Sequence, residues 1–322
     1  MINSEKNNMA SVDIIVPCFN EENNIYRFYC AASAAVADAK NYRFRYIFVD
    51  DGSTDGTLEK IKELSAGEKT SRINYISFSR NFGKEAAMYA GLRASRGDYA
   101  VIIDADLQHP PALIMEMIEK TEKTGCDSCA ARRVSRKGEP KIRSAFARVF
   151  YKIMNRFSDI EIIDGAVDFR LMNRKMVKAV VSMPESQRFS KGIFSWVGFY
   201  TEWIEFENVK RISGESKWSV WSLTKYAASG FLDFAVSPLK FIGMFGAATT
   251  AAAAVYLITE IVKTLIFGKD IPGYASTICL ILFFGGLIIA ILGVMGEYIG
   301  RMYLETKNRP VYIEKESDID ED

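Results

Sequence analysis

The sequence has 322 residues, with 41 Lys and Arg against 40 Asp and Glu, one His and five Cys. This length suits one large domain with an appendage, and the near-zero net charge argues against a nucleic-acid partner. A single histidine also excludes the catalytic triads in which histidine is the base.

Residues 1–210 alternate between apolar strands and helices. Strands are predicted at residues 12–17, 45–50, 73–79 and 99–104, and the helices that follow them at residues 21–40, 53–65, 83–95 and 110–125. Continuously apolar strands separated by helices indicate a mostly parallel sheet with helices on both faces. The predicted fold class is therefore α/β, in a domain that covers residues 1–215.

The next segment, residues 216–235, contains SVWSLTKYAASGFLDF, in which apolar and polar side chains alternate at helical spacing. Trp221 and Lys225 lie within it, and such residues are typical of helices in the membrane interface. We therefore predict an interfacial amphipathic helix at residues 216–235. The alternative is an amphipathic helix packed on the preceding domain.

Two long uncharged stretches follow, at residues 241–259 and 271–296. As helices, both are long enough to span a hydrocarbon core of about 30 Å. They predict a transmembrane hairpin at residues 236–300, with spans at about 237–260 and 274–298. Two buried core helices are the alternative.

Basic residues flank the outer ends of this hairpin, Lys240 before it and Arg301 after it. The positive-inside tendency then puts both ends in the cytoplasm. The remaining residues, 301–322, are predicted to be a cytoplasmic tail. Its acidic end, EKESDIDED, is predicted to be disordered.

Acidic residues follow three of the predicted strands, in the segments CFNEE, DDGSTDG and DADLQ. Ligands of such sheets bind at the carboxyl ends of the strands, where converging carboxylates repel unless a cation or hydrogen-bond donors join them. Asp104 and Asp106 lie on the same side of an extended segment. Two carboxylates suit Mg²⁺ or Mn²⁺ completed by substrate phosphates, so the sequence predicts a divalent cation at this edge.

Six motifs, taken in order, resemble those of one family. They are VPCFNEE, VDDGSTDGT, SRNFGKEAA, DADLQHP, DFRLMNR and RISGESKW, and they are similar to family 2 inverting glycosyltransferases of GT-A fold. With the two spans, the sequence resembles the bacterial polyprenyl-phosphate glycosyltransferases, relatives of dolichol-phosphate mannose synthase. Val167 and Asn173 stand where the family commonly has glycine and aspartate, a departure that leaves the metal residues unchanged. The resemblance covers nearly the whole chain.

The resemblance implies a site for a nucleotide sugar and a metal ion. The residues around the nucleotide sugar would be Pro17, Phe19, Asn20, Glu21, Asp50, Asp51, Lys84, Asp104, Arg211 and Lys217. Asp51 would accept a hydrogen bond from the uracil imide, and Arg211 and Lys217 would lie on a loop that closes over the diphosphate. Asp104, Asp106 and Gln108 would hold Mg²⁺ or Mn²⁺. For Lys84 the alternative is a solvated helix terminus.

The resemblance also implies catalytic and acceptor residues. Asp168 matches the position of a catalytic aspartate, and Asp106 and Arg170 complete the catalytic set. The alternative is that Asp168 is a structural partner of Arg170. Arg132 and Arg143 would bind the phosphate of a lipid acceptor, because arginine pairs well with phosphate oxygens. A basic loop that faces anionic lipid is the alternative for these arginines.

The predicted function is inverting transfer of one sugar to undecaprenyl phosphate at the cytoplasmic face of the bacterial cytoplasmic membrane. The donor would be a UDP-sugar, UDP-glucose or UDP-N-acetylglucosamine, and the resemblance implies a homotetramer. A processive polysaccharide synthase is one alternative, although QRFSKG at Gln187 does not match the expected Q-x-x-R-W motif. A non-catalytic membrane scaffold with a nucleotide-binding fold is another, and the presence of both Asp104 and Asp106 argues against it.

Overall fold

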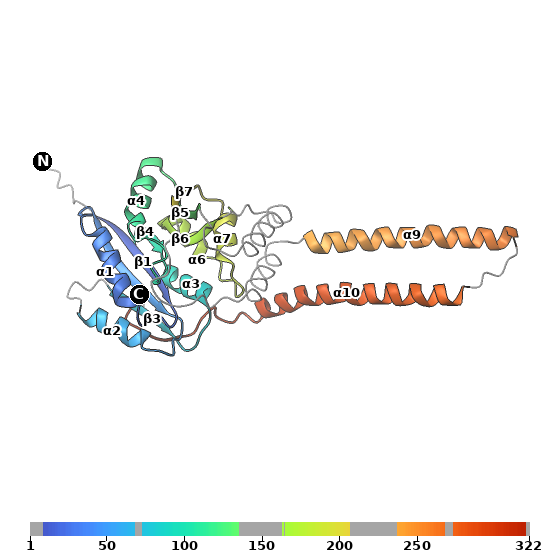
Figure 1. Cartoon of the computed structure of the whole chain (residues 1–322), viewed down its shortest axis with the longest axis horizontal. Helices are drawn as coiled ribbons and strands as arrows, with labels where there is room; N and C mark the ends of the chain where they lie inside the picture. The colour runs from blue at the N-terminus through green and yellow to red at the C-terminus, as the bar shows by residue number, and fades with distance from the viewer. Residues whose placement is uncertain are drawn as a thin grey trace.

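The computed structural model describes residues 9–67, 73–134, 163, 165–206, 237–267 and 273–319. Within these residues, an eight-stranded sheet forms the centre of an α/β domain (Figure 1). Its strands are β1 (Ala10–Cys18), β2 (Tyr42–Asp50), β3 (Ile73–Phe78), β4 (Tyr99–Ile102), β5 (Ser128–Arg133), β6 (Ala166–Asn173), β7 (Thr201–Phe206) and β8 (Glu314–Ser317). Their order across the sheet is β7-β5-β6-β4-β1-β2-β3-β8.

The strands β3, β2, β1 and β4 pair in parallel, as their continuously apolar sequences predict. The rest of the sheet is mixed, because β6 lies antiparallel between β4 and β5, β7 is parallel to β5, and β8 is antiparallel to β3. The apolar pattern could not reveal this change of direction. An antiparallel strand buried on both faces is as continuously apolar as a parallel one.

Helices cover both faces of the sheet, as predicted. One face carries α1 (Ile25–Val36), α2 (Thr57–Gly67) and α4 (Leu113–Thr124), and the other carries α3 (Lys84–Ala94), α6 (Arg174–Val181) and α7 (Ser190–Trp196). Helix α3 approaches β1 closely at Gly91, where a Cβ atom would lie 2.3 Å from Cγ2 of Ile15. Only a residue without a side chain permits this approach. The contact sets the position of α3, and hence of Lys84 at its start, relative to β1.

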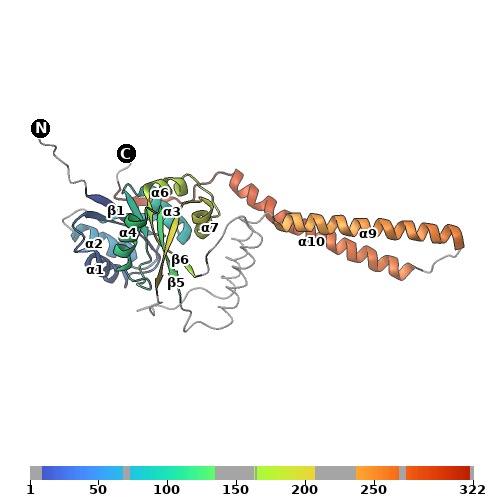
Figure 2. The same cartoon turned by 90° about the horizontal axis from the view of Figure 1, so that it is seen from above.

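Two long helices, α9 (Ser237–Phe267) and α10 (Tyr274–Thr306), run alongside each other and away from the α/β domain (Figures 1 and 2). They contain the two predicted spans and continue beyond both. In the described part of the chain, Phe283–Thr306 is long and apolar enough to cross a membrane. The predicted interfacial helix, residues 216–235, lies outside the described residues.

The end of α10 is attached to the α/β domain through Glu305. Its Oε1 atom accepts hydrogen bonds from the backbone N–H of Ser186 at 3.0 Å and from the Ser186 hydroxyl at 2.6 Å. The N–H of Gln187 lies 3.4 Å from the same oxygen. Ser186 and Gln187 belong to the loop before α7, so this contact joins the long hairpin to the segment that leads into α7.

The C-terminal segment returns to the sheet after α10, which contradicts the predicted disorder of the acidic tail for residues 314–319; residues 320–322 lie outside the described residues. The ring of Tyr312 stacks on that of Phe78 with centroids 4.7 Å apart, and β8 then pairs with the edge of β3. Lys62 Nζ lies 2.7 Å from Glu316 Oε2. Composition suggested disorder because the tail is acidic. Its apolar anchor and its backbone pairing with an edge strand outweigh that charge.

Candidate active site

The loops that follow β1 and β2 are tied together at the carboxyl edge of the sheet. Asn20 has φ of 54°, a left-handed conformation that asparagine tolerates better than most residues. Its Oδ1 accepts a hydrogen bond from the N–H of Thr54 at 2.8 Å, and its own N–H donates to Ser53 Oγ at 2.9 Å. Asp50 stabilises the same turn, accepting from the Ser53 N–H at 3.1 Å and the Ser77 hydroxyl at 2.9 Å.

Asp51 connects the β2 loop to the start of α3. Its carboxylate accepts three bonds, one from the N–H of Phe82 at 2.6 Å and two from that of Gly83 at 3.1 and 2.9 Å. Burial raises the pKa of Asp51 to about 6, although these N–H groups oppose the change. Because a carboxylate offers about four acceptor positions, Asp51 retains capacity for one further donor.

Asp104, Asp168 and Lys84 form the charged centre of the site. In the antiparallel register of β4 and β6, Ile102 faces Arg170, and continuing this register by two residues sets Asp104 opposite Asp168. Lys84 reaches between them from the start of α3. Its Nζ lies 2.7 Å from Asp104 Oδ1 and 2.9 Å from Asp168 Oδ2. Lys84 is therefore central to the site, and the alternative of a solvated helix terminus is wrong.

The charges of this centre stabilise one another. Burial acts to lower the pKa of Lys84, but the carboxylates of Asp104 and Asp168 outweigh it and raise that pKa well above its usual range. Burial likewise acts to raise the pKa of Asp168, and Lys84, with Lys191 and Arg170, holds it well below its usual range. Both groups are charged at neutral pH. A carboxylate with so low a pKa is a poor general base, so Asp168 is better suited to orient a ligand than to remove a proton.

The carboxylates after β4 fit a divalent cation that is only partly held by the protein. Asp104 contacts Lys84, while Asp106 is half-buried and its Oδ1 accepts a bond from the backbone N–H of Gln108 at 3.1 Å. Among the described residues, no three acidic, histidine or cysteine side chains gather closely enough to enclose a metal ion. Two hard oxygen donors suit Mg²⁺ or Mn²⁺ that takes its other ligands from phosphates and water.

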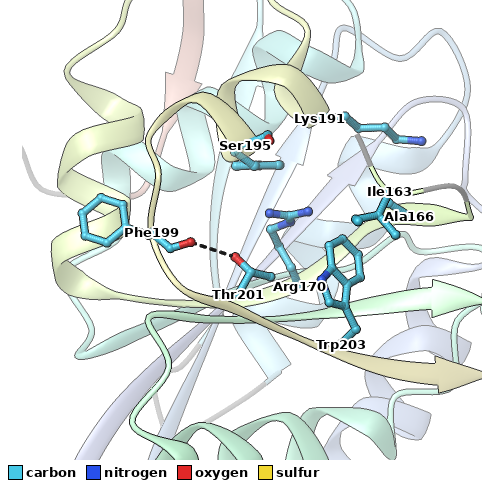
Figure 3. A pocket seen from close by; sticks show the side chains of 9 residues that line it. Ile163, Ala166, Arg170, Lys191, Ser195, Phe199, Thr201 and Trp203 are labelled. Atoms are coloured by element: carbon cyan, nitrogen blue, oxygen red, sulfur yellow. Dashed lines mark hydrogen bonds between the residues drawn. The ribbon is translucent and has the colours of Figure 1, made fainter. Parts of the chain in front are cut away.

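A pocket of about 190 Å³ lies on the face of the sheet that α7 covers (Figure 3). Its lining includes Arg170, Lys191, Phe194, Ser195, Thr201 and Trp203. The Arg170 side chain comes from β6, and its guanidinium carbon lies 4.0 Å from the centroid of the Phe194 ring. Burial lowers the pKa of Arg170 to about 10, against the opposing effect of Asp168, so the group stays protonated at neutral pH.

Comparison with known proteins establishes the family. Residues 13–181 match the family model for glycosyl transferase family 2, and residues 237–302 match that for the GtrB C-terminal hairpin. The chain belongs to glycosyl transferase family 2. This glycosyltransferase is 42% identical over 310 residues to CsbB of Bacillus subtilis, a protein named as a glycosyltransferase. The match covers 96% of this chain and 92% of that one.

Three further proteins are similar to this chain. The prophage bactoprenol glucosyl transferase homolog of Escherichia coli is 39% identical over 304 residues, which cover 94% of this chain and 98% of that one. The bactoprenol glucosyl transferase of Shigella phage SfII is 39% identical over 309 residues, covering 95% and 98%. The mannosyl-3-phosphoglycerate synthase of Rubrobacter xylanophilus is a more distant likeness, with a TM-score of 0.47 and 16% identity over 69% of this chain and 71% of that one.

Other residues predicted for this glycosyltransferase line the same edge or lie outside the described chain. Pro17 is buried in β1 and Phe19 is half-buried just after it, while the Glu21 N–H donates to Thr57 Oγ1 at 2.8 Å. Arg132 lies on β5, opposite Ala166 of β6. Arg143, Arg211 and Lys217 are outside the described residues.

Asp168 forms an ion pair with Lys84, and no hydrogen bond or ion pair joins it to Arg170 among the described residues. Its Oδ1 is buried with no hydrogen-bond partner in that part of the chain. His109 lies in the loop after β4. It is buried between the rings of Phe169 and Phe206, with Nδ1 3.8 Å from Asp104 Oδ2. Burial lowers the pKa of His109, so its ring is neutral at pH 7.

Sequence reasoning missed Lys191 and Trp203, which the fold brings to the pocket. Neither belongs to one of the six motifs, and both are far from Arg170 in the sequence. Their one detectable signal was residue type, a lysine and a tryptophan. Such residues are too common on protein surfaces for that signal to select them.

Proposed function

We propose that this glycosyltransferase transfers one glucose from UDP-glucose to undecaprenyl phosphate. The observation that carries the proposal is the similarity, over more than nine-tenths of both chains, to proteins named bactoprenol glucosyl transferases. It covers the α/β domain and the hairpin together. The names specify glucose, and they give no support to UDP-N-acetylglucosamine, which was the other donor predicted from the sequence.

The reaction would be a single in-line displacement. An oxygen of the lipid phosphate dianion attacks C1 of glucose, and the bond from C1 to the diphosphate oxygen breaks with its electron pair leaving on UDP. The anomeric configuration inverts. Two dianions become a phosphodiester monoanion and a UDP trianion, so no proton is released and no strong base is required. The low pKa of Asp168 agrees with this chemistry.

Residues of this chain would orient both substrates. Asp51, with its remaining acceptor capacity, would take the uracil imide N–H, and Asn20 and Asp50 hold the loops around it. Lys84 would place a positive charge beside the diphosphate while keeping Asp104 and Asp168 in position. Asp104 and Asp106 would hold Mg²⁺ or Mn²⁺, which neutralises negative charge on the departing diphosphate. Fixed charges of this kind lower the barrier because they need no reorganisation during the reaction.

The hairpin would place this chemistry at the membrane. We propose that α9 and α10 both cross the bacterial cytoplasmic membrane, with the α/β domain of residues 1–215 and the residues after 300 in the cytoplasm. The apolar segment Phe283–Thr306 supports one crossing, and the exposed side chains of α9, such as Leu265 at 80% exposed, support the other. An anchored enzyme meets its lipid acceptor at high effective concentration. The homotetramer implied by the resemblance stays a prediction.

A transfer assay with purified full-length protein in detergent tests the proposal. Radiolabelled UDP-glucose, UDP-N-acetylglucosamine and GDP-mannose are each supplied with undecaprenyl phosphate and Mn²⁺ or Mg²⁺. We expect label in the organic phase from UDP-glucose, and its loss in excess EDTA or in Asp106→Asn. Preferred transfer from either other donor would contradict the assignment of glucose, and several sugars per lipid would indicate the processive synthase.

A further inference from the structure

Arg170 is a buried cation whose guanidinium has an unpaired nitrogen in the described part of the chain. The residue is 3% exposed, and its Nε is buried with no hydrogen-bond partner among the described residues. Its guanidinium rests on the ring of Phe194. Buried polar groups in native proteins are nearly always hydrogen-bonded, and the exceptions are often groups with a functional role. A guanidinium is well suited to bind phosphate by paired hydrogen bonds.

The pocket around Arg170 has the chemistry of a phosphate site. Lys191 adds a second positive charge from α7, and the hydroxyls of Ser195 and Thr201 add polar groups. In Figure 3 the guanidinium of Arg170 lies between Ser195 and Trp203. The nearby carboxylate of Asp168 is already paired with Lys84, so the lining has an excess of positive charge. A volume of about 190 Å³ is sufficient for a phosphate group and the atoms next to it.

The place of the pocket along the sheet indicates which phosphate it holds. The loops expected to bind the nucleotide follow β1, β2 and β3, and the metal carboxylates follow β4. The pocket lies beyond them, lined by residues of β6, α7 and β7. An in-line displacement requires the nucleophile and the leaving group on opposite sides of the sugar. A phosphate on the β5–β6–β7 side of Asp104 would therefore belong to the acceptor.

We propose that this pocket binds the phosphate group of the polyprenyl phosphate acceptor through Arg170 and Lys191. The inference rests on the proposed function and deepens it. It gives Arg170 a binding role in place of the catalytic one predicted from the sequence, and it adds Lys191, which no motif includes. Arg132 and Arg143 stay predictions for the same phosphate.

Lipid binding without the donor tests this directly. The dissociation constants of undecaprenyl phosphate and of undecaprenol, which lacks the phosphate, are measured in the same detergent micelles for the full-length protein. We expect Arg170→Met to weaken binding of the phosphate form by about 10- to 150-fold, the effect of one lost charged hydrogen bond. Lys191→Met, at a half-exposed position, should weaken it by about 3- to 10-fold. Binding of undecaprenol and of UDP should be unchanged.

Lys178→Met is the matched control, because Lys178 is an exposed lysine of the neighbouring helix α6 and belongs to no part of the proposed site. Arg170→Lys, which keeps the charge in the buried position, should recover part of the affinity. Because Lys191 is half-exposed, Lys191→Met should fold normally and tests the pocket independently of Arg170. A purely structural defect would weaken undecaprenol and UDP binding together with the phosphate form.

Three results would overturn the inference. If Arg170→Met and Lys191→Met weaken binding of UDP and leave the lipid phosphate unaffected, the pocket holds the diphosphate of the donor. If both variants keep the preference of the wild type for the phosphate over undecaprenol, the acceptor phosphate lies elsewhere and the proposed function still stands. If the wild type itself shows no such preference, the polyprenyl phosphate acceptor is wrong, and this inference falls with it.

Discussion

Replacing Lys84 by methionine removes the cation that separates Asp104 from Asp168, and keeps much of the volume of the side chain. In the native site its ammonium contacts both carboxylates, at 2.7 and 2.9 Å. Without it two carboxylates face each other across β4 and β6. We therefore expect Lys84→Met to lower the stability of the α/β domain, and to abolish transfer because the diphosphate loses a neighbouring charge.

The size of the stability loss follows from partial burial. The side chains of Lys84, Asp104 and Asp168 are 38%, 24% and 19% exposed, which is between a surface ion pair and a buried one. Exposed pairs contribute about 0–1 kcal/mol, and breaking a buried pair costs about 3–5 kcal/mol. We expect a loss of about 1–3 kcal/mol, or about 2–12 °C in melting temperature for a domain of this size.

A double-mutant cycle with Asp168→Asn measures the interaction by thermal unfolding. If the loss in Lys84→Met comes from an unpaired carboxylate, adding Asp168→Asn should recover part of the melting temperature. Mn²⁺ with UDP should also stabilise Lys84→Met more than the wild type, since the ion replaces the missing charge. Equal melting temperatures for Lys84→Met and wild type, or losses that simply add in the double variant, would refute this reasoning.

Three further predictions follow from the same structure. Affinity for uridine, which carries no titrating phosphate, should fall by up to about tenfold per pH unit as pH drops below 6, because the pKa of Asp51 is about 6 and the imide N–H prefers the ionised carboxylate. Calorimetry should show no such pH dependence in Asp51→Asn. If this variant keeps the pH dependence, another group is responsible for it. Glu305→Ala should raise the KM for the lipid by about 2- to 5-fold, while Glu305→Gln, which keeps the acceptor oxygen for Ser186, should not raise it. Equal KM values for the two variants, or a change in UDP affinity, would exclude a role for the contact with Ser186. In intact cells, after replacement of the exposed Cys30, an impermeant thiol reagent should label Asp270→Cys and not Glu314→Cys. The reverse labelling would show that the hairpin has the opposite orientation in the membrane.

Much of the site could be predicted because many of its residues lie in short sequence motifs. Asp104 and Asp106 follow an apolar strand directly, and the rule that ligands bind at the carboxyl ends of strands places them at an edge. The structure sets Asp168 opposite Asp104 through the register of β4 with β6. The motif DFR selected Asp168 by resemblance, but its contact with Lys84 depends on that long-range register.

The parts that could not be predicted depend on long-range packing. Lys84 reaches the two carboxylates because Gly91 allows α3 to pack closely on β1, a contact without a local signal. Strand β8 was missed for a related reason. The charges of EKES resemble those of a disordered tail, and the edge of β3 that accepts this strand lies more than two hundred residues earlier in the sequence.

The most direct test of the account is the identity of the lipid product. Purified wild-type protein is incubated with UDP-glucose, undecaprenyl phosphate and Mn²⁺, and the lipid extract is analysed by mass spectrometry and by NMR of the anomeric proton. The account predicts undecaprenyl phosphate with one added hexose in the β configuration, inverted from the α-linked donor, and none with Asp106→Asn. An unmodified lipid, a product with the α configuration, or an undiminished yield from Asp106→Asn would contradict it.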